Sequence, residues 1–194
     1  MLTLGRRLAL VTVMCLVVLF AQAASGPAAS STHLIAIDHQ GFWLGPLVWN
    51  GQTSKRAVTL GDFIRAFGQE SSCAIGKSRA KSHVTWRSRG VRGDFTTLGG
   101  LPHSSDTACT APAHVQPDTV EVFDAVWHTG RGLRVGDTAV RLSALYPRAT
   151  RRKDGWWLIT RTNDPLWGTY GQLVAGIRDD RIIYLRLVLH AEGD

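Results

Sequence analysis

The chain has 194 residues, 44% of them hydrophobic and 19% charged, so its length suits one medium domain or two small ones that share a core. Lys and Arg exceed Asp and Glu by 7, a modest excess that keeps a protein dispersed in water. The chain contains no nucleic-acid-binding motif, and we expect no nucleic acid among its partners.

A secretory signal is predicted at residues 1–23. Two arginines precede the 13-residue apolar run LALVTVMCLVVLF, and the small-residue exit AQA follows it. The run is shorter than the roughly 20 residues that a membrane span needs, so cleavage is favoured over an uncleaved anchor. Cys15 lies inside the run rather than at its end, which does not fit a lipid anchor. We expect a secreted, periplasmic or cell-envelope protein without a stable membrane span, and a disordered lead-in at 24–32.

Two cysteines, Cys73 and Cys109, remain after the signal is removed. Because export delivers them to an oxidising compartment, a disulfide between them is the simplest prediction. A redox pair usually has the close Cys-x-x-Cys spacing, and zinc needs further ligands at recognisable spacing. Neither pattern occurs in the sequence.

A first α+β module is predicted at residues 33–97. HLIAID and GFWLGPLVW are typical of strands, because they alternate or are rich in apolar and aromatic residues. VTLGDFIRAFG, at 58–68, predicts a short helix with an acid near its start and a glycine stop. SHVTWRS and GDFTTL follow, joined by a turn that contains Gly90, and they predict a hairpin.

A linker between two halves is predicted at residues 98–118. Glycine, proline, serine and threonine replace the apolar periodicity there, and Cys109 would fasten the segment.

A second α+β module is predicted at 119–194. Its strand candidates are VEVFDAVWHT, GWWLITR, QLVAGIR and RIIYLRLVLH. Asp179-Asp180 predicts a tight turn between the last two.

The stretch GLRVGDTAVRLSALYPRA, 132–149, predicts a glycine corner, one amphipathic helix and a proline stop. Gly136 would permit the corner, and either Asp137 or Thr138 would cap the helix. We expect an apolar stripe of core residues along this helix, made by Val140, Leu142 and Leu145. LGD at 60–62 matches VGD at 135–137, each before a short helix, which favours an internal duplication.

Five features together resemble secreted bacterial proteins of the β-lactamase-inhibitor-protein-like superfamily and the small outer-membrane assembly lipoproteins that share its module. These features are GPLV at 45–48, the helix ending in FG, the spacing from Cys73 to Trp86, the return to Cys109, and GLRVGDTAVRLSALYPRA. The resemblance implies tandem modules, each a short helix packed on an antiparallel sheet, that contact other proteins. The usual Gly-Met-Thr corner is Gly-Asp-Thr in this chain.

No catalytic, cofactor-binding or metal-binding residue is predicted. There is no Gly-x-Ser-x-Gly elbow and no phosphate-binding loop, and no histidine falls in a helical metal pair or beside a nucleophile motif. Carboxylates such as Asp124, Asp164 and Asp179 would act as an acid and a base only if the fold brought two of them into one cleft.

The candidate binding residues form one cluster after the second predicted helix: Arg148, Arg151, Arg152, Lys153, Trp156 and Trp157. Cations beside tryptophans suit an acidic protein or an anionic envelope polymer, whereas a solvated loop is the simpler interpretation. On one strand the two tryptophans would point to opposite faces, one buried and the other covered.

A secreted, non-catalytic binding protein that contacts a protein or an envelope component through its sheet is therefore the leading hypothesis. The alternatives are a hydrolase of envelope polymers whose carboxylates assemble in the fold, and an inhibitor of an extracellular enzyme, which the resemblance alone implies.

Overall fold

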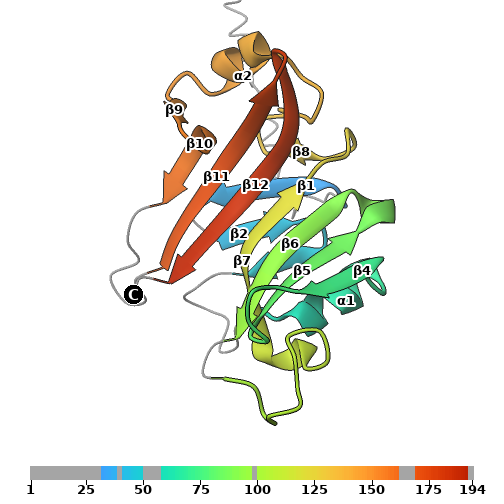
Figure 1. Cartoon of the computed structure of the whole chain (residues 1–194). Coiled ribbons are helices and arrows are strands. Elements are labelled where there is room, and N and C mark those ends of the chain that lie inside the picture. Colours follow the sequence, from blue (N-terminus) through green and yellow to red (C-terminus); the bar gives the residue numbers. More distant parts are fainter. Residues whose placement is uncertain (1–31, 39–40, 50–57, 98–99, 162–168, 192–194) are drawn as a thin grey trace, which may run out of the picture.

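A computed structural model describes residues 32–38, 41–49, 58–97, 100–161 and 169–191 (Figure 1). The predicted signal peptide and the lead-in up to residue 31 lie outside these residues. The helices are α1 (Leu60–Phe67) and α2 (Ala139–Leu145), with one-turn 3-10 helices at Arg87–Arg89 and Pro112–His114. The strands are β1 (Leu34–Asp38), β2 (Gly41–Leu44), β3 (Leu47–Trp49), β4 (Ser72–Ile75), β5 (Lys81–Trp86), β6 (Val91–Thr97), β7 (Val115–Val122), β8 (His128–Thr129), β9 (Thr150–Arg152), β10 (Gly155–Arg161), β11 (Thr169–Arg178) and β12 (Arg181–Ala191).

An eight-stranded antiparallel sheet is the main structural unit, with the strand order β4-β5-β6-β7-β12-β11-β10-β9. Each strand pairs with its chain neighbour except at the centre, where β7 pairs with β12. Strands of the predicted first half, β4 to β6, thus belong to the same sheet as strands of the predicted second half. β7 begins at Val115, inside the predicted linker 98–118.

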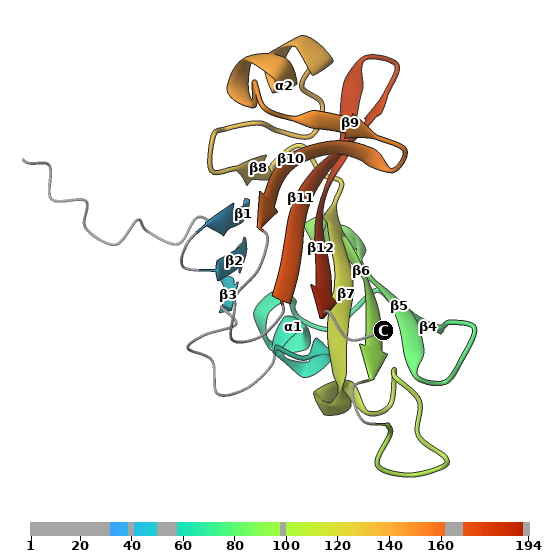
Figure 2. The same ribbon diagram turned by 90° about the vertical axis from the view of Figure 1, so that its left-hand side faces the viewer.

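A smaller sheet lies against one face of the large sheet. Its order is β3-β2-β1-β8, and its β1–β8 pair is parallel, unlike the antiparallel sheets that we expected. Figure 2 shows this sheet and α1 on the same side of the large sheet. Side chains of both sheets and α1 form the core cluster, in which Ile35, Phe63, Trp86 and Leu185 are fully buried. In the large sheet the core residues alternate along the strands, as the pleat requires.

Helix α1 confirms the prediction for 58–68. The Asp62 carboxylate accepts hydrogen bonds from the Thr59 backbone N–H at 2.8 Å and from the Thr59 hydroxyl at 2.9 Å, which fixes the first turn. Asp62 also pairs with Arg65, one turn on. The buried side of the helix carries Phe63 and Phe67, whose rings pack near Trp86.

Helix α2 starts at the corner that the sequence indicated. Gly136 has a φ of 94°, in the region that favours glycine, and the Thr138 hydroxyl caps the helix by accepting a hydrogen bond from the Arg141 backbone N–H at 3.2 Å. The predicted stripe is wrong at one position: Leu142 is fully buried and Leu145 is half-buried, but Val140 is 75% exposed. Only one turn of this seven-residue helix faces the core, so the stripe is narrower than expected.

The α+β class is confirmed, with many more strand residues than helix residues. The hairpin β5–β6 forms around Gly90 as predicted, and Asp179 and Asp180 make the β11–β12 turn with positive φ values of 50° and 60°. Two edge strands, β4 and β9, were not predicted. Within the described residues, neither helix has the length and hydrophobicity of a membrane span.

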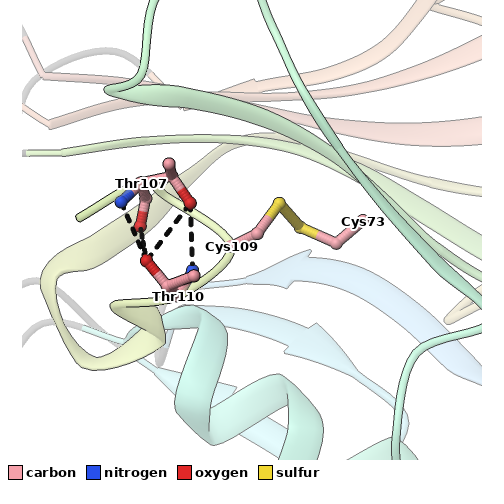
Figure 3. Close-up of a disulfide and its surroundings, with 4 residues drawn as sticks. All are labelled: Cys73, Thr107, Cys109 and Thr110. Atoms are coloured by element: carbon pink, nitrogen blue, oxygen red, sulfur yellow. Dashed lines mark hydrogen bonds between the residues drawn. A yellow bond between two sulfur atoms is a disulfide. The ribbon is translucent and has the colours of Figure 1, made fainter. Parts of the chain in front are cut away.

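The predicted disulfide is present. Cys73 on β4 is bonded to Cys109, 36 residues later, in the connection between β6 and β7 (Figure 3). Reciprocal hydrogen bonds between Thr107 and Thr110 close the turn that carries Cys109. The neighbouring Ala108 is fully buried, and its N–H donates to the Arg79 carbonyl at 2.8 Å. The disulfide therefore fastens a packed loop to the edge strand β4.

Replacing Leu142 with alanine is expected to lower the free energy of unfolding by roughly 2–5 kcal/mol, because the side chain is fully buried and its removal leaves a cavity. The matched control, Val140→Ala, removes a side chain that is 75% exposed and is expected to change stability by less than about 0.5 kcal/mol. Urea unfolding measures both. Equal losses of stability for the two variants would contradict the orientation in which Leu142 faces the core and Val140 faces away from it.

Replacing both Cys73 and Cys109 with alanine is expected to lower the free energy of unfolding by about 4 kcal/mol, because the bond closes a loop of 36 residues in the unfolded chain. Denaturant unfolding of the oxidised protein and the double variant measures the difference. Two titratable thiols in the purified oxidised protein would contradict the assignment.

Candidate binding surfaces

The face of the large sheet that points away from the small sheet is a candidate binding surface, and we name it the open face. No described helix or strand packs on it, as Figure 2 shows. Its side chains lie in rows across the strands, since directly paired residues point to the same side. One row has a member on every strand, from β4 to β9: Ser72, Thr85, Arg92, Glu121, Arg186, Val174, Trp157 and Thr150.

Glu121 is at the centre of this row, and only 4% of its surface is exposed. Its carboxylate accepts hydrogen bonds from Arg186 on β12, at 3.0 Å from Nε and 2.7 Å from the terminal nitrogen. Arg92 on β6 pairs with the other carboxylate oxygen. Burial alone would lower the pKa of Arg186, but the hydrogen bond to Glu121 and nearby negative charges outweigh it and raise this pKa. The carboxylate is therefore fully paired between two cations.

A second polar row lies beside the first. His83 on β5 pairs with the Asp94 carboxylate on β6, and the Thr119 hydroxyl on β7 donates to the other Asp94 oxygen at 3.0 Å. A His–carboxylate pair is a common part of hydrolase sites. Here the His83 and Asp94 side chains are 66% and 49% exposed on the open face, so the pair is a surface polar contact and is not enclosed in a cleft.

Aromatic side chains continue the surface toward β9. The Arg186 guanidinium lies 4.5 Å from the centre of the Tyr184 ring, and Arg152 lies 5.0 Å from that of Trp157. Asp154 joins both rings, because its carboxylate accepts from Trp157 Nε1 at 3.0 Å and its carbonyl accepts from the Tyr184 hydroxyl at 3.2 Å. Tyr, Trp and Arg are the residue types that contribute most to protein interfaces.

The four predicted cations are all exposed: Arg148, Arg151, Arg152 and Lys153. The expectation that they occupy a loop is wrong for Arg151 and Arg152, which belong to the edge strand β9 and pair with β10. The expectation for the tryptophans is also wrong in part, since Trp156 and Trp157 are both half-buried. They do point to opposite faces, because Trp156 pairs with Ala175 in the core and Trp157 pairs with Val174 on the open face.

A groove of ≈ 540 Å³ lies between the β9–β10 and β11–β12 hairpins. It brings together Arg151, Arg152, Lys153 and Trp156 of the predicted cluster, whereas Arg148 and Trp157 do not line it. Arg178, Ile177 and Tyr184 contribute from the other hairpin.

Three of the residues that organise the open face were not predicted as binding residues: Glu121, Tyr184 and Arg186. The signal was a charge at alternate positions of apolar strands, as in VEV and YLRLV, which marks the face that points away from the core. The sequence could not show which of these charges form pairs, because Glu121 on β7 and Arg186 on β12 are 65 positions apart.

Replacing Glu121 with glutamine is expected to lower the free energy of unfolding by about 2–3 kcal/mol, because it leaves two neighbouring guanidinium groups without their shared anion. The loss stays below that of a wholly buried pair because Arg92 is 56% exposed and can take up water. The control Arg92→Gln keeps the Arg186 pair and is expected to cost less than about 1 kcal/mol. Chemical unfolding that finds no loss for Glu121→Gln would contradict a structural role of this triad.

Among the described residues no group of three or more His, Cys, Asp or Glu side chains is placed to hold a metal ion.

Comparison with protein-family models, curated proteins and solved structures finds no match for this chain. The superfamily resemblance therefore stays a prediction, and the function is inferred from the residues themselves.

Proposed function

We propose that this is an exported, non-catalytic binding protein that contacts a protein or a cell-envelope component through the open face of its large sheet. The observation that carries the proposal is the difference between the two faces of the sheet. One face is covered by the small sheet and α1. On the other face no described helix or strand packs, and it carries charged and aromatic side chains that contact one another.

The fixed geometry of these side chains supports binding. Arg92, Glu121 and Arg186 hold one another in place, and Tyr184 and Trp157 are held through Asp154. Side chains that are ordered before binding lose little conformational entropy when a partner arrives. A surface of this kind suits a macromolecular partner with complementary charges.

We further propose that the fold consists of two units, each a helix followed by four strands that pair in chain order. This is supported by the succession α1-β4-β5-β6-β7 and α2-β9-β10-β11-β12, with β8 before α2. The last strands of the two units, β7 and β12, pair antiparallel at the centre, as a two-fold relation between duplicated units would produce.

Location outside the cytoplasm is part of the proposal. The sequence carries a predicted signal, and a disulfide is compatible with an oxidising compartment. Inhibition of an extracellular enzyme is one form that binding would take, and the superfamily resemblance alone implies it.

Capture from solubilised cell envelope tests the proposal. A face variant, Lys81→Glu with Thr85→Glu, places acids on the open face at β5. The matched control, Arg134→Glu with Ala144→Glu, makes the same change of net charge at exposed positions before and in α2. We expect wild type and control to retain the same partner, and the face variant to lose it at least tenfold by quantitative mass spectrometry. Equal retention by all three proteins would exclude the open face as the contact surface.

A further inference from the structure

The groove between the β9–β10 and β11–β12 hairpins is a second candidate site, which adjoins the open face at Arg152, Asp154 and Tyr184. Four cations line it, Arg151, Arg152 and Lys153 from one hairpin and Arg178 from the other. All four are exposed, and none of them forms a salt bridge with an acid of the described residues. Cations that share a groove without partner acids repel one another, and an anionic ligand would relieve this repulsion.

The groove also contains two acids, Asp154 and Asp180. The Asp154 carboxylate accepts a hydrogen bond from Trp157 Nε1, and Asp180 lies in the β11–β12 turn. The cations therefore outnumber the acids in the groove by two.

One wall of the groove is a strand edge. The last pairing of β11 with β10 joins Ala175 to Trp156, but β11 continues to Arg178. Over Gly176–Arg178 it pairs only with β12, and among the described strands none pairs on its other side. Backbone groups along such an edge can accept an added strand.

Apolar side chains complete the groove. Trp156, Ile177 and Ile183 line it, each half-buried. Tyr184 holds the wall in position, because its ring packs on Gly176, where a Cβ atom would lie 2.2 Å from the ring, and its hydroxyl donates to the opposite hairpin at Asp154. The groove is thus a fixed feature between two tied hairpins.

We propose that this groove binds an extended acidic segment of a partner protein, in which carboxylates alternate with apolar residues. The backbone of the segment pairs with Gly176–Arg178 as an added strand. Its carboxylates lie against the guanidinium groups of Arg151 and Arg178 and the ammonium group of Lys153, and its apolar residues contact Trp156 and Ile177. Arginine suits this role because its planar group can hold a carboxylate through two hydrogen bonds.

The strand edge is what favours a peptide over an anionic polysaccharide or polyphosphate. All of these ligands would satisfy the cations, but only a peptide has the alternating N–H and C=O groups that match an unpaired strand edge. The length of the free edge, three residues, limits the pairing to a short segment. Charge therefore contributes much of the affinity, which should fall as salt screens these exposed groups.

The test uses fluorescence anisotropy with a labelled eight-residue peptide of alternating glutamate and valine as the probe. A groove variant carries Arg151→Ser, Lys153→Ser and Arg178→Ser. The control carries Lys77→Ser, Arg87→Ser and Arg134→Ser, which remove the same charge from exposed positions outside the groove. We expect the groove variant to bind the peptide at least tenfold more weakly than wild type, and the control to stay within threefold. All six positions are exposed, and thermal unfolding verifies that each variant is folded.

Two further probes separate the proposed ligand from other anions. The same peptide with N-methylated valines keeps its charge but loses backbone donors, so it should bind wild type at least tenfold more weakly. Tighter binding of inorganic polyphosphate than of the peptide would overturn the proposal in favour of an anionic polymer. Equal peptide binding by the groove variant and the control would overturn the site itself. Because Lys81 and Thr85 do not line the groove, failure here and failure of the open-face variant are distinct outcomes.

Discussion

The pairing of β7 with β12 is the constraint on which the remaining structure depends. It joins two four-stranded halves into one sheet, and Glu121 lies on this joint between Arg92 and Arg186. A buried carboxylate is tolerated only when its charge is compensated. Here Arg186 hydrogen-bonds one carboxylate oxygen of Glu121 and Arg92 forms an ion pair with the other. The register β6-β7-β12 is thereby specified by charge as well as by the core residues on the opposite face.

The two faces of the sheet follow from this register. With Val120, Val122, Leu185 and Leu187 directed to the core, the alternate residues of β7 and β12 must point outward. The outward positions carry charges and aromatic rings that contact one another across the strands. The sheet therefore presents an ordered polar surface rather than a set of independent solvated side chains, and the same ordering extends through Tyr184 to the hairpins that form the groove.

Local features of the fold could be predicted from the sequence. The cap of α2 at Thr138 and the turn at Asp179 and Asp180 depend on a few neighbouring residues. The disulfide could be predicted because only two cysteines follow the predicted signal. Edge strand β9 was missed because its cations resemble a solvated loop and only its pairing with β10 makes it a strand. The candidate site was found in part: Arg151 to Lys153 and Trp156 are brought together, but their partner hairpin with Arg178 and Tyr184 required the tertiary structure.

The continuity of the sheet across its centre is the central claim, and backbone NMR tests it directly. Uniformly labelled protein should show cross-strand NOEs between Glu121 and Arg186 and between Val120 and Leu187, the pairs that face each other on β7 and β12. Their amide hydrogens should also be among the slowest to exchange, as expected for central strands. Strong NOEs within β4–β7 and within β9–β12, with none between β7 and β12, would show two separate sheets and contradict the account of both the open face and its buried glutamate.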